Sequence, residues 1–179
     1  MRILHTSDWH LGQNFYSKSR AAEHEAFLNW LLETARTHEV DVIIVAGDIF
    51  DTGSPPSYAR ELYNRFVVNL QQTGCHLVIV AGNHDSVATL NESRDILAFL
   101  NTTVVASAGH APQILKKRDG TPGAVLCPIP FLRPRDIVQS QAGLSGAEKQ
   151  QHLRQQGANQ WQRRQHGRVA RLLLRLTVR

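Results

Sequence analysis

The chain begins with the stretch MRILHTSDWHLG, residues Met1 to Gly12, in which a short apolar strand leads into a polar turn. Ile3 and Leu4 lie in the strand, and Asp8 and His10 follow it two residues apart. At the carboxyl end of a strand, side chains with this spacing can face one cleft. A carboxylate and an imidazole placed together are typical metal ligands.

Two later stretches repeat this order of an apolar strand followed by a polar turn. They read DVIIVAGDIFD over residues 41–51 and HLVIVAGNHD over residues 76–85. The first turn carries Asp48, and the second carries Asn83 and His84. Because the carboxyl ends of parallel strands meet at one edge of a sheet, the three turns are expected to converge on one site.

Apolar residues recur at helical spacing in the segments between these strands. Helices are predicted over residues 19–37, over residues 57–72, and from Ser86 or Thr89 to Leu100. A further strand is predicted at Val104 and Val105, and a hairpin over residues 112–130. The fold class is therefore α/β, with a mainly parallel βαβαβ sheet, right-handed crossovers and flanking helices.

The 179 residues suffice for one domain with a sizeable core, and 42% of them are hydrophobic. The formal net charge of +5 is unevenly distributed, because residues 1–151 have a net charge of −2, whereas residues 152–179 contain seven Arg and no acidic residue. An acidic body needs bound cations before it can accept a phosphate backbone.

Length and composition also predict where the protein works. The chain has no apolar run approaching the ~18 residues of a membrane span and no secretory signal, so a cytoplasmic protein without a membrane partner is expected. Cys75 and Cys127 lie far apart in apolar surroundings, which predicts two buried free thiols.

The candidate ligands combine carboxylate and amide oxygens with an imidazole nitrogen. This mixture suits Mn²⁺, Fe²⁺ or Zn²⁺ better than Ca²⁺. If Asp48 bridges two ions ~3.5–4 Å apart, the pair can activate a water and stabilise charge on a phosphoryl oxygen, which is the chemistry of phosphate ester hydrolysis. His84 is placed to donate a proton to the phosphate or to the leaving oxygen.

Two further residues, Asp51 and His110, each have two interpretations. Asp51 either caps the second turn or supports a ligand from behind. His110, in the sequence AGHAP, could be a ligand, but no strand of the same kind precedes it, so a structural role is favoured.

The motifs DWHLG, GDIFD and GNHDS resemble the first three motifs of the calcineurin-like metallophosphoesterases. The longer stretches HTSDWHLGQ, VAGDIFDTGSPP, VAGNHDS and PIPFLRPRDI extend the resemblance over residues 1–150, to the branch of that family formed by nucleases of DNA double-strand-break repair. The resemblance implies an Mn²⁺-dependent DNA phosphodiesterase, both a double-strand 3′ to 5′ exonuclease and a hairpin-opening endonuclease.

The resemblance also implies partners and residue roles. Such a nuclease works as a dimer together with an ATPase subunit. Asp8 and His10 would bind the first metal, Asp48 would bridge, Asn83 would bind the second metal, and His84 would serve the scissile phosphate.

The family completes both metal sites with histidines from later GH and GHxH motifs, and no GHxH occurs in this chain. The expectation is therefore the first half of the family's two-sheet sandwich, over residues 1–150. Residues 151–179, rich in Arg and Gln, are expected to lie outside the core, as an unrelated or out-of-frame tail or as a basic DNA-binding tail.

Two functional classes follow from the missing motifs. One is a metal-dependent nuclease, either active as this chain or the truncated remnant of one, with little activity expected because the second metal site would be incomplete. The other is a non-catalytic dimerisation or DNA-binding module, in which helices within residues 19–37 and 60–70 form the interface.

Overall fold

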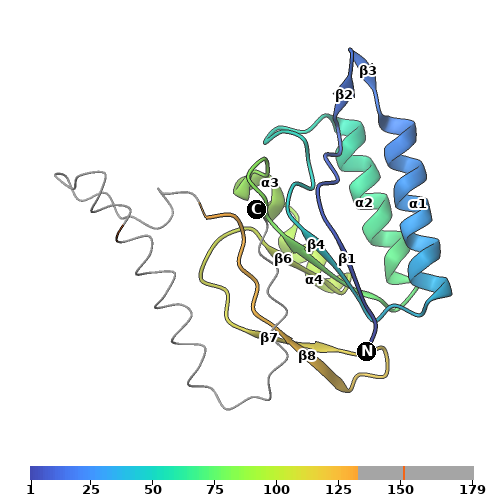
Figure 1. Ribbon diagram of the computed structural model, residues 1–179, viewed down its shortest axis with the longest axis vertical. Helices are drawn as coiled ribbons and strands as arrows, with labels where there is room; N and C mark the ends of the chain where they lie inside the picture. Colours follow the sequence, from blue (N-terminus) through green and yellow to red (C-terminus); the bar gives the residue numbers. More distant parts are fainter. Residues whose placement is uncertain (133–150, 152–179) are drawn as a thin grey trace.

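Figure 1 shows the computed structural model of the chain, which describes residues 1–132 and residue 151. The helices and strands, in chain order, are β1 (Ile3–Thr6), β2 (Asn14–Phe15), β3 (Lys18–Ser19), α1 (Ala21–Thr37), β4 (Val42–Ala46), α2 (Ser57–Gln71), β5 (His76–Val80), α3 (Val87–Asn91), α4 (Arg94–Phe99), β6 (Thr102–Val105), β7 (Gln113–Lys116) and β8 (Pro122–Leu126). The predicted tail, residues 151–179, lies outside the described residues except for Gln151.

The centre of the fold is a four-stranded sheet in the order β1-β4-β5-β6. All three strand pairs are parallel. Each of these strands returns next to its predecessor after a connection through α1, through α2, or through α3 and α4, which places every strand's carboxyl end at the same edge. The predicted α/β class and parallel sheet are therefore confirmed.

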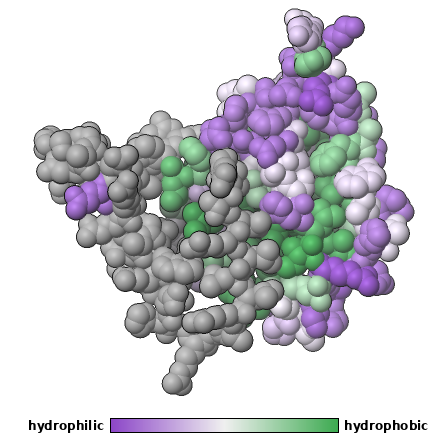
Figure 2. Space-filling view, viewed as in Figure 1, coloured by the Kyte–Doolittle hydropathy of each residue, from purple (hydrophilic) through white to green (hydrophobic). Residues whose placement is uncertain are grey.

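Both faces of this sheet are covered, which explains why its inner strands are apolar without interruption. Ile43 and Val45 face a core shared with the four helices. Val42 and Ile44 face a second core, which Leu115 and Leu126 of the β7–β8 hairpin complete. Every residue of β4 is buried as a result. Figure 2 shows apolar residues gathered over the middle of the described surface, with hydrophilic residues around them.

Helices α1 and α2 pack side by side over one face (Figure 1). Helix α1 begins two residues later than predicted, because Lys18 and Ser19 pair with residues 14–15 in a short hairpin. In α2, Phe66 and Leu70 are buried, whereas Tyr58 and Leu62 are only partly buried. The other residues of the buried stripe are Ala59, Tyr63 and Val67.

The prediction of the third helix as one continuous element is wrong. The helix is divided into α3 and α4, with Glu92 and Ser93 between them. The Ser86 hydroxyl accepts a 3.3 Å hydrogen bond from the main-chain N–H of Thr89 and so caps α3. Leu90 and Leu97 are both buried, so the two short helices still cover the same core.

The predicted hairpin is confirmed as β7 paired antiparallel with β8. Its turn is held against the end of α1 and the connection to β4 by Arg118, whose side chain donates 3.0 Å hydrogen bonds to the carbonyl oxygens of Val40 and Ala35. Both cysteines are free, but only Cys75 is buried, so the prediction of a buried thiol is wrong for Cys127, which is half-buried.

Candidate metal centre

The turn after β1 is held to the turn after β4 by main-chain hydrogen bonds. The N–H groups of Asp8, His10 and Leu11 donate to the carbonyl oxygens of Gly47 (3.1 Å), Asp48 (2.9 Å) and Ile49 (2.9 Å). The parallel pairing of the two strands thus continues into the turns that carry the candidate ligands. This continuation fixes the distance between the Asp8–His10 segment and Asp48.

Three residues of these turns have left-handed backbone conformations, with φ of 55° at Asp8, 45° at His10 and 50° at Asp48. Such conformations cost about 1–3 kcal/mol each in a residue other than glycine and concentrate at functional sites. Trp9, between Asp8 and His10, is 5% exposed and packs edge-on against Phe66 at a 5.2 Å ring separation. Burial of the Trp9 ring therefore anchors the turn, while Asp8 and His10 on either side of Trp9 remain accessible to solvent.

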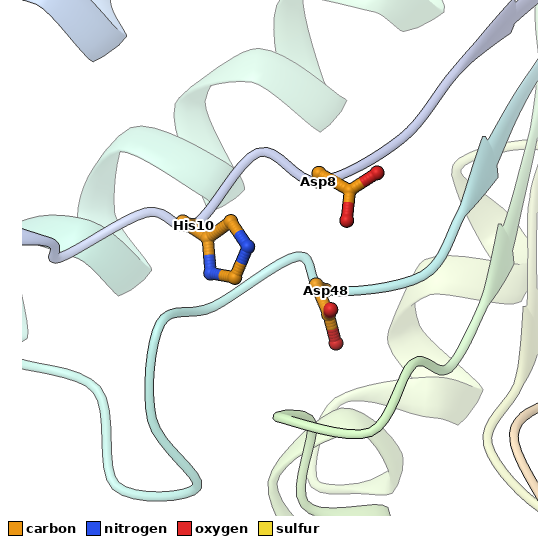
Figure 3. Close-up of side chains that lie close together, drawn as sticks. All are labelled: Asp8, His10 and Asp48. Atoms are coloured by element: carbon orange, nitrogen blue, oxygen red, sulfur yellow. The ribbon is translucent and has the colours of Figure 1, made fainter. Parts of the chain in front are cut away.

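Figure 3 shows Asp8, His10 and Asp48 facing a common space. Each offers one donor atom, and these three atoms all lie within 4.8 Å of one another. Asp8 is exposed, His10 is half-buried and Asp48 is 5% exposed. Within residues 1–132 and residue 151, no Lys or Arg forms an ion pair with either carboxylate. Two carboxylates beside an imidazole without a neutralising side chain fit a divalent cation.

The third turn lies against Asp48. The main-chain N–H of His84 donates a 2.9 Å hydrogen bond to Asp48 Oδ1. A Cβ atom at Gly82 would overlap the side chain and main chain of Asp48, so only glycine permits this approach. Asn83, which lies between Gly82 and His84 in the chain, is exposed. Its place in the chain brings it beside Asp48, while its role as a ligand stays a prediction.

Asp85 is a site residue that the sequence interpretation missed. Its carboxylate is 1% exposed and accepts hydrogen bonds from the N–H groups of Gly82 (2.8 Å), Phe50 (3.2 Å) and Ile49 (3.3 Å). Burial raises the pKa of Asp85, the three N–H donors lower it, and the Asp48 carboxylate raises it further. One carboxylate thus joins the second and third turns. The only signal in the sequence is its position as the last residue of GNHD.

His84 projects an exposed imidazole beside His10, with the two ring centroids 5.1 Å apart. Its Nδ1 lies 3.0 Å from the Asp51 carbonyl oxygen. Because a carbonyl oxygen can only accept, Nδ1 carries the proton in this contact. The other nitrogen, Nε2, is then available to a substrate.

Asp51 contacts both histidines. Its carbonyl oxygen accepts from His84, and its Oδ1 lies 3.2 Å from His10 Nδ1. Of its two interpretations, these contacts favour support of a ligand over a simple turn cap. His110 does not belong to the donor group of Asp8, His10 and Asp48. Burial lowers the pKa of His110, and the positive charge of Arg94 lowers it further.

In the part of the chain that the structure describes, no helix has the length and apolar character that crossing a membrane requires.

Comparison with known proteins identifies the family. The model of the calcineurin-like phosphoesterase family matches residues 1–156. The SbcD subunit of the nuclease SbcCD from Escherichia coli K12 is 89% identical over 153 residues, which are 86% of this chain and 38% of that protein. The SbcD subunit from Rhodobacter capsulatus is 35% identical over 162 residues, covering 82% of this chain and 40% of that protein.

The chain thus spans about two fifths of the length of these relatives. The matched region contains the turns that carry Asp8, His10 and Asp48 and the third turn that lies against them, and the sheet and helices are those of part of a metallophosphoesterase fold. The chain belongs to the calcineurin-like phosphoesterase family.

Proposed function

We propose that this chain is the N-terminal part of a metal-dependent DNA phosphodiesterase of the SbcD type. The observation that carries the proposal is the group of Asp8, His10 and Asp48, whose donor atoms lie within 4.8 Å of one another at the carboxyl edge of the sheet. The similarity to the SbcD subunit of the nuclease SbcCD supports a phosphodiester substrate in DNA.

The resemblance to the family implies a role for each candidate ligand. Asp8 and His10 would hold the first cation, Asp48 would bridge, and Asn83 would contribute to the second. Mn²⁺ suits this mixture of oxygen and nitrogen donors. When bound, the cations supply Lewis-acid stabilisation of the phosphoryl charge and lower the pKa of a water.

The chain's own residues orient the substrate and handle protons. Since His84 Nδ1 is held by the Asp51 carbonyl oxygen, Nε2 is the atom that would face a phosphate. In the imidazolium form, His84 Nε2–H can donate to a phosphoryl oxygen or to the leaving oxygen. The Asp48 hydrogen bond to the main-chain N–H of His84 keeps that imidazole beside the ligands.

The relatives' name describes a subunit of a nuclease, and the resemblance to that family implies the proposed assembly. The protein would act in the cytoplasm as a homodimer within a heterotetramer that includes an SbcC-type ATPase. Its activities would be the double-strand 3′ to 5′ exonuclease and the hairpin-opening endonuclease of DNA recombination, replication and repair.

The alternative is a dimerisation or DNA-binding module without catalysis. Large apolar side chains exposed on three helices favour an interface. They are Trp30 of α1 at 60% exposure, Val68 of α2 at 50%, and Ile96 and Phe99 of α4 at 66% and 88%. This alternative requires no metal.

Metal binding separates the two candidates. We expect the purified 179-residue chain to bind Mn²⁺, measured as loss of the free-ion signal in electron paramagnetic resonance. Asp48→Asn should abolish most of this binding, because it removes a charged ligand. Asp95→Asn, an exposed carboxylate on α4, is the matched control and should bind as the parent chain does. A parent chain that binds no Mn²⁺ at millimolar concentration would favour the module.

A further inference from the structure

A chain of side-chain contacts leads away from the metal centre to the start of α1. It begins at Asp51, whose Oδ1 accepts a 3.3 Å hydrogen bond from Gln13 Nε2 and lies 3.2 Å from His10 Nδ1. One carboxylate oxygen therefore faces both an amide donor and the ring of a candidate ligand. The carboxylate is itself only 30% exposed.

Gln13 connects this carboxylate to Arg20. Gln13 Oε1 accepts a 2.7 Å hydrogen bond from Arg20 Nη1, while its amide nitrogen donates to Asp51. Because a guanidinium can only donate, Arg20 fixes which end of the Gln13 amide faces Asp51. Arg20 Nε in turn donates to Glu23 Oε2 at 2.6 Å.

Main-chain bonds hold the same residues together. The N–H of Gln13 donates to the His10 carbonyl oxygen at 3.0 Å, and the N–H of Arg20 donates to the Gln13 carbonyl oxygen at 3.3 Å. The β2–β3 hairpin is thus closed at its base by Gln13 and Arg20. Because these main-chain bonds fix the positions of Gln13 and Arg20, the side-chain contacts that the two residues make also restrict where the Asp51 carboxylate can lie.

His10 is the residue on which these contacts converge. Its Nδ1 is buried, and its geometry toward Asp51 Oδ1 falls short of a hydrogen bond despite the 3.2 Å separation. Such bonds are often poorly aligned before a ligand binds and tighten afterwards. In Figure 3 one ring nitrogen of His10 is directed toward Asp8 and Asp48, and the other is directed away. A proton on Nδ1, facing Asp51, leaves Nε2 unprotonated as the metal donor.

We propose that Asp51, Gln13 and Arg20 are positioning residues that hold His10 in the tautomer and orientation in which Nε2 faces Asp8 and Asp48. The inference rests on the proposed function, because it assigns His10 to a metal. None of the three residues needs to touch the metal or the substrate. Their effect on metal binding passes through the His10 ring.

The first test uses the metal-free chain. Long-range ¹H–¹⁵N NMR reports which ring nitrogen of His10 carries the proton, and we expect Nδ1–H in the parent chain. Asp51→Leu removes the acceptor at similar size and should give a mixture of tautomers, and Gln13→Leu should shift the population in the same direction. Asp51→Asn keeps an oxygen acceptor and should restore the Nδ1–H tautomer.

The second test measures Mn²⁺ affinity by electron paramagnetic resonance. Loss of such a supporting contact commonly weakens metal binding by about 10–100-fold, which is the effect expected for Asp51→Leu. Gln13→Leu and Arg20→Met should weaken binding less. Arg65→Met is the matched control, because Arg65 is an exposed arginine that pairs with Glu25 and Glu61 instead; it should change neither measurement.

The two tests distinguish failure of this inference from failure of the proposed function. An unchanged His10 tautomer in Asp51→Leu and Gln13→Leu, with Mn²⁺ affinity equal to that of the parent chain, would overturn the inference. If the parent chain binds no Mn²⁺, the proposed function fails, and the tautomer in the Asp51 and Gln13 variants still decides whether these residues position the ring. Urea unfolding of each variant shows whether a change in affinity reflects lost stability.

Discussion

The main-chain N–H of His84 donates a 2.9 Å hydrogen bond to Asp48 Oδ1, which joins the turn after β5 to the turn after β4. Asp85 strengthens the same junction by accepting from Gly82, Ile49 and Phe50. The third turn is therefore held in place by protein contacts, independently of any cation. Breaking these contacts should therefore weaken Mn²⁺ binding and lower the free energy of unfolding together.

Gly82→Ala should disturb both properties. The added Cβ would overlap Asp48, so the turn must move, and overpacking of this kind destabilises by about 1–3 kcal/mol. Urea unfolding and Mn²⁺ binding measure the two effects. Gly53→Ala is the matched control, because its Cβ would meet only Ser86 Cβ at an ordinary 3.5 Å. Equal stability of the two variants would contradict the close approach of Gly82 to Asp48.

Asp85→Asn should destabilise the fold by about 2–3 kcal/mol, because the amide nitrogen cannot accept from a main-chain N–H and leaves a buried donor without a partner. The comparison is Asp95→Asn, an exposed carboxylate in the first turn of α4, which should change unfolding by at most about 1 kcal/mol. The free energy of unfolding in urea measures both. A stability loss at Asp85 no larger than that at Asp95 would show that the three hydrogen bonds contribute little.

Asp41 should make stability depend on pH. Burial raises its pKa, but the main-chain N–H groups of Arg118 and Arg2 lower it more, so its folded-state pKa lies below the ordinary 3.8. A depressed carboxyl pKa stabilises the fold above the unfolded-state value, and this stabilisation is lost as pH falls through 3.8 toward the folded-state pKa.

Asp41→Asn removes this titration. The free energy of unfolding of the parent chain should therefore fall more steeply than that of the variant as the pH is lowered below about 5. Glu39→Gln, an exposed carboxylate that pairs with Arg2, is the control and should leave the pH profile unchanged. Parallel profiles for the parent chain and Asp41→Asn would refute the prediction.

The two thiols should differ in reactivity. Cys75 is 1% exposed, and burial raises its pKa to about 12, whereas Cys127 is half-buried. A thiol attacks disulfide reagents through its thiolate, so Cys75 should be inert in the native chain. We expect one rapidly reacting thiol with Ellman's reagent. Cys127→Ser should remove this reaction, and Cys75→Ser should leave it.

Nuclease activity of this chain should be low even in millimolar Mn²⁺. Under the proposed assignment, the described residues would give the first cation the donors Asp8, His10 and Asp48, and the second only Asp48 and the predicted ligand Asn83. Loss of one electrostatic element of this kind commonly lowers a rate by about 10²–10³-fold. The assay uses a labelled hairpin DNA with Asp48→Ala as control. Robust cleavage that Asp48→Ala abolishes would show that the three turns suffice.

The sequence alone predicted the four strands of the central sheet, their parallel pairing and the approach of their turns to one another, but not the short β2–β3 hairpin. These features depend on local information, namely apolar runs of strand length followed by glycine and polar residues. Asp8, His10 and Asp48 could be named in advance because parallel strands place their carboxyl ends together. The resemblance to the family depended on the same short motifs.

Which face of a helix is buried could be determined only from the tertiary structure. Helix α2 carries apolar or aromatic residues on adjoining stripes, and which stripe turns inward depends on its packing against α1 and the sheet. The division between α3 and α4 had no comparable signal. Leu90 and Leu97 are seven residues apart, a spacing that one continuous helix also satisfies.

The supporting contacts of the metal centre were likewise beyond the sequence. Gln13 and Arg20 are ordinary polar residues in a loop, and Asp51 had two interpretations until its position beside His10 was known. Gln13 and Asp51 are 38 residues apart, so only folding brings their side chains together. The candidate ligands follow from local pattern, whereas the residues proposed to orient them depend on long-range packing, because a hydrogen bond requires a distance and an angle that no sequence spacing specifies.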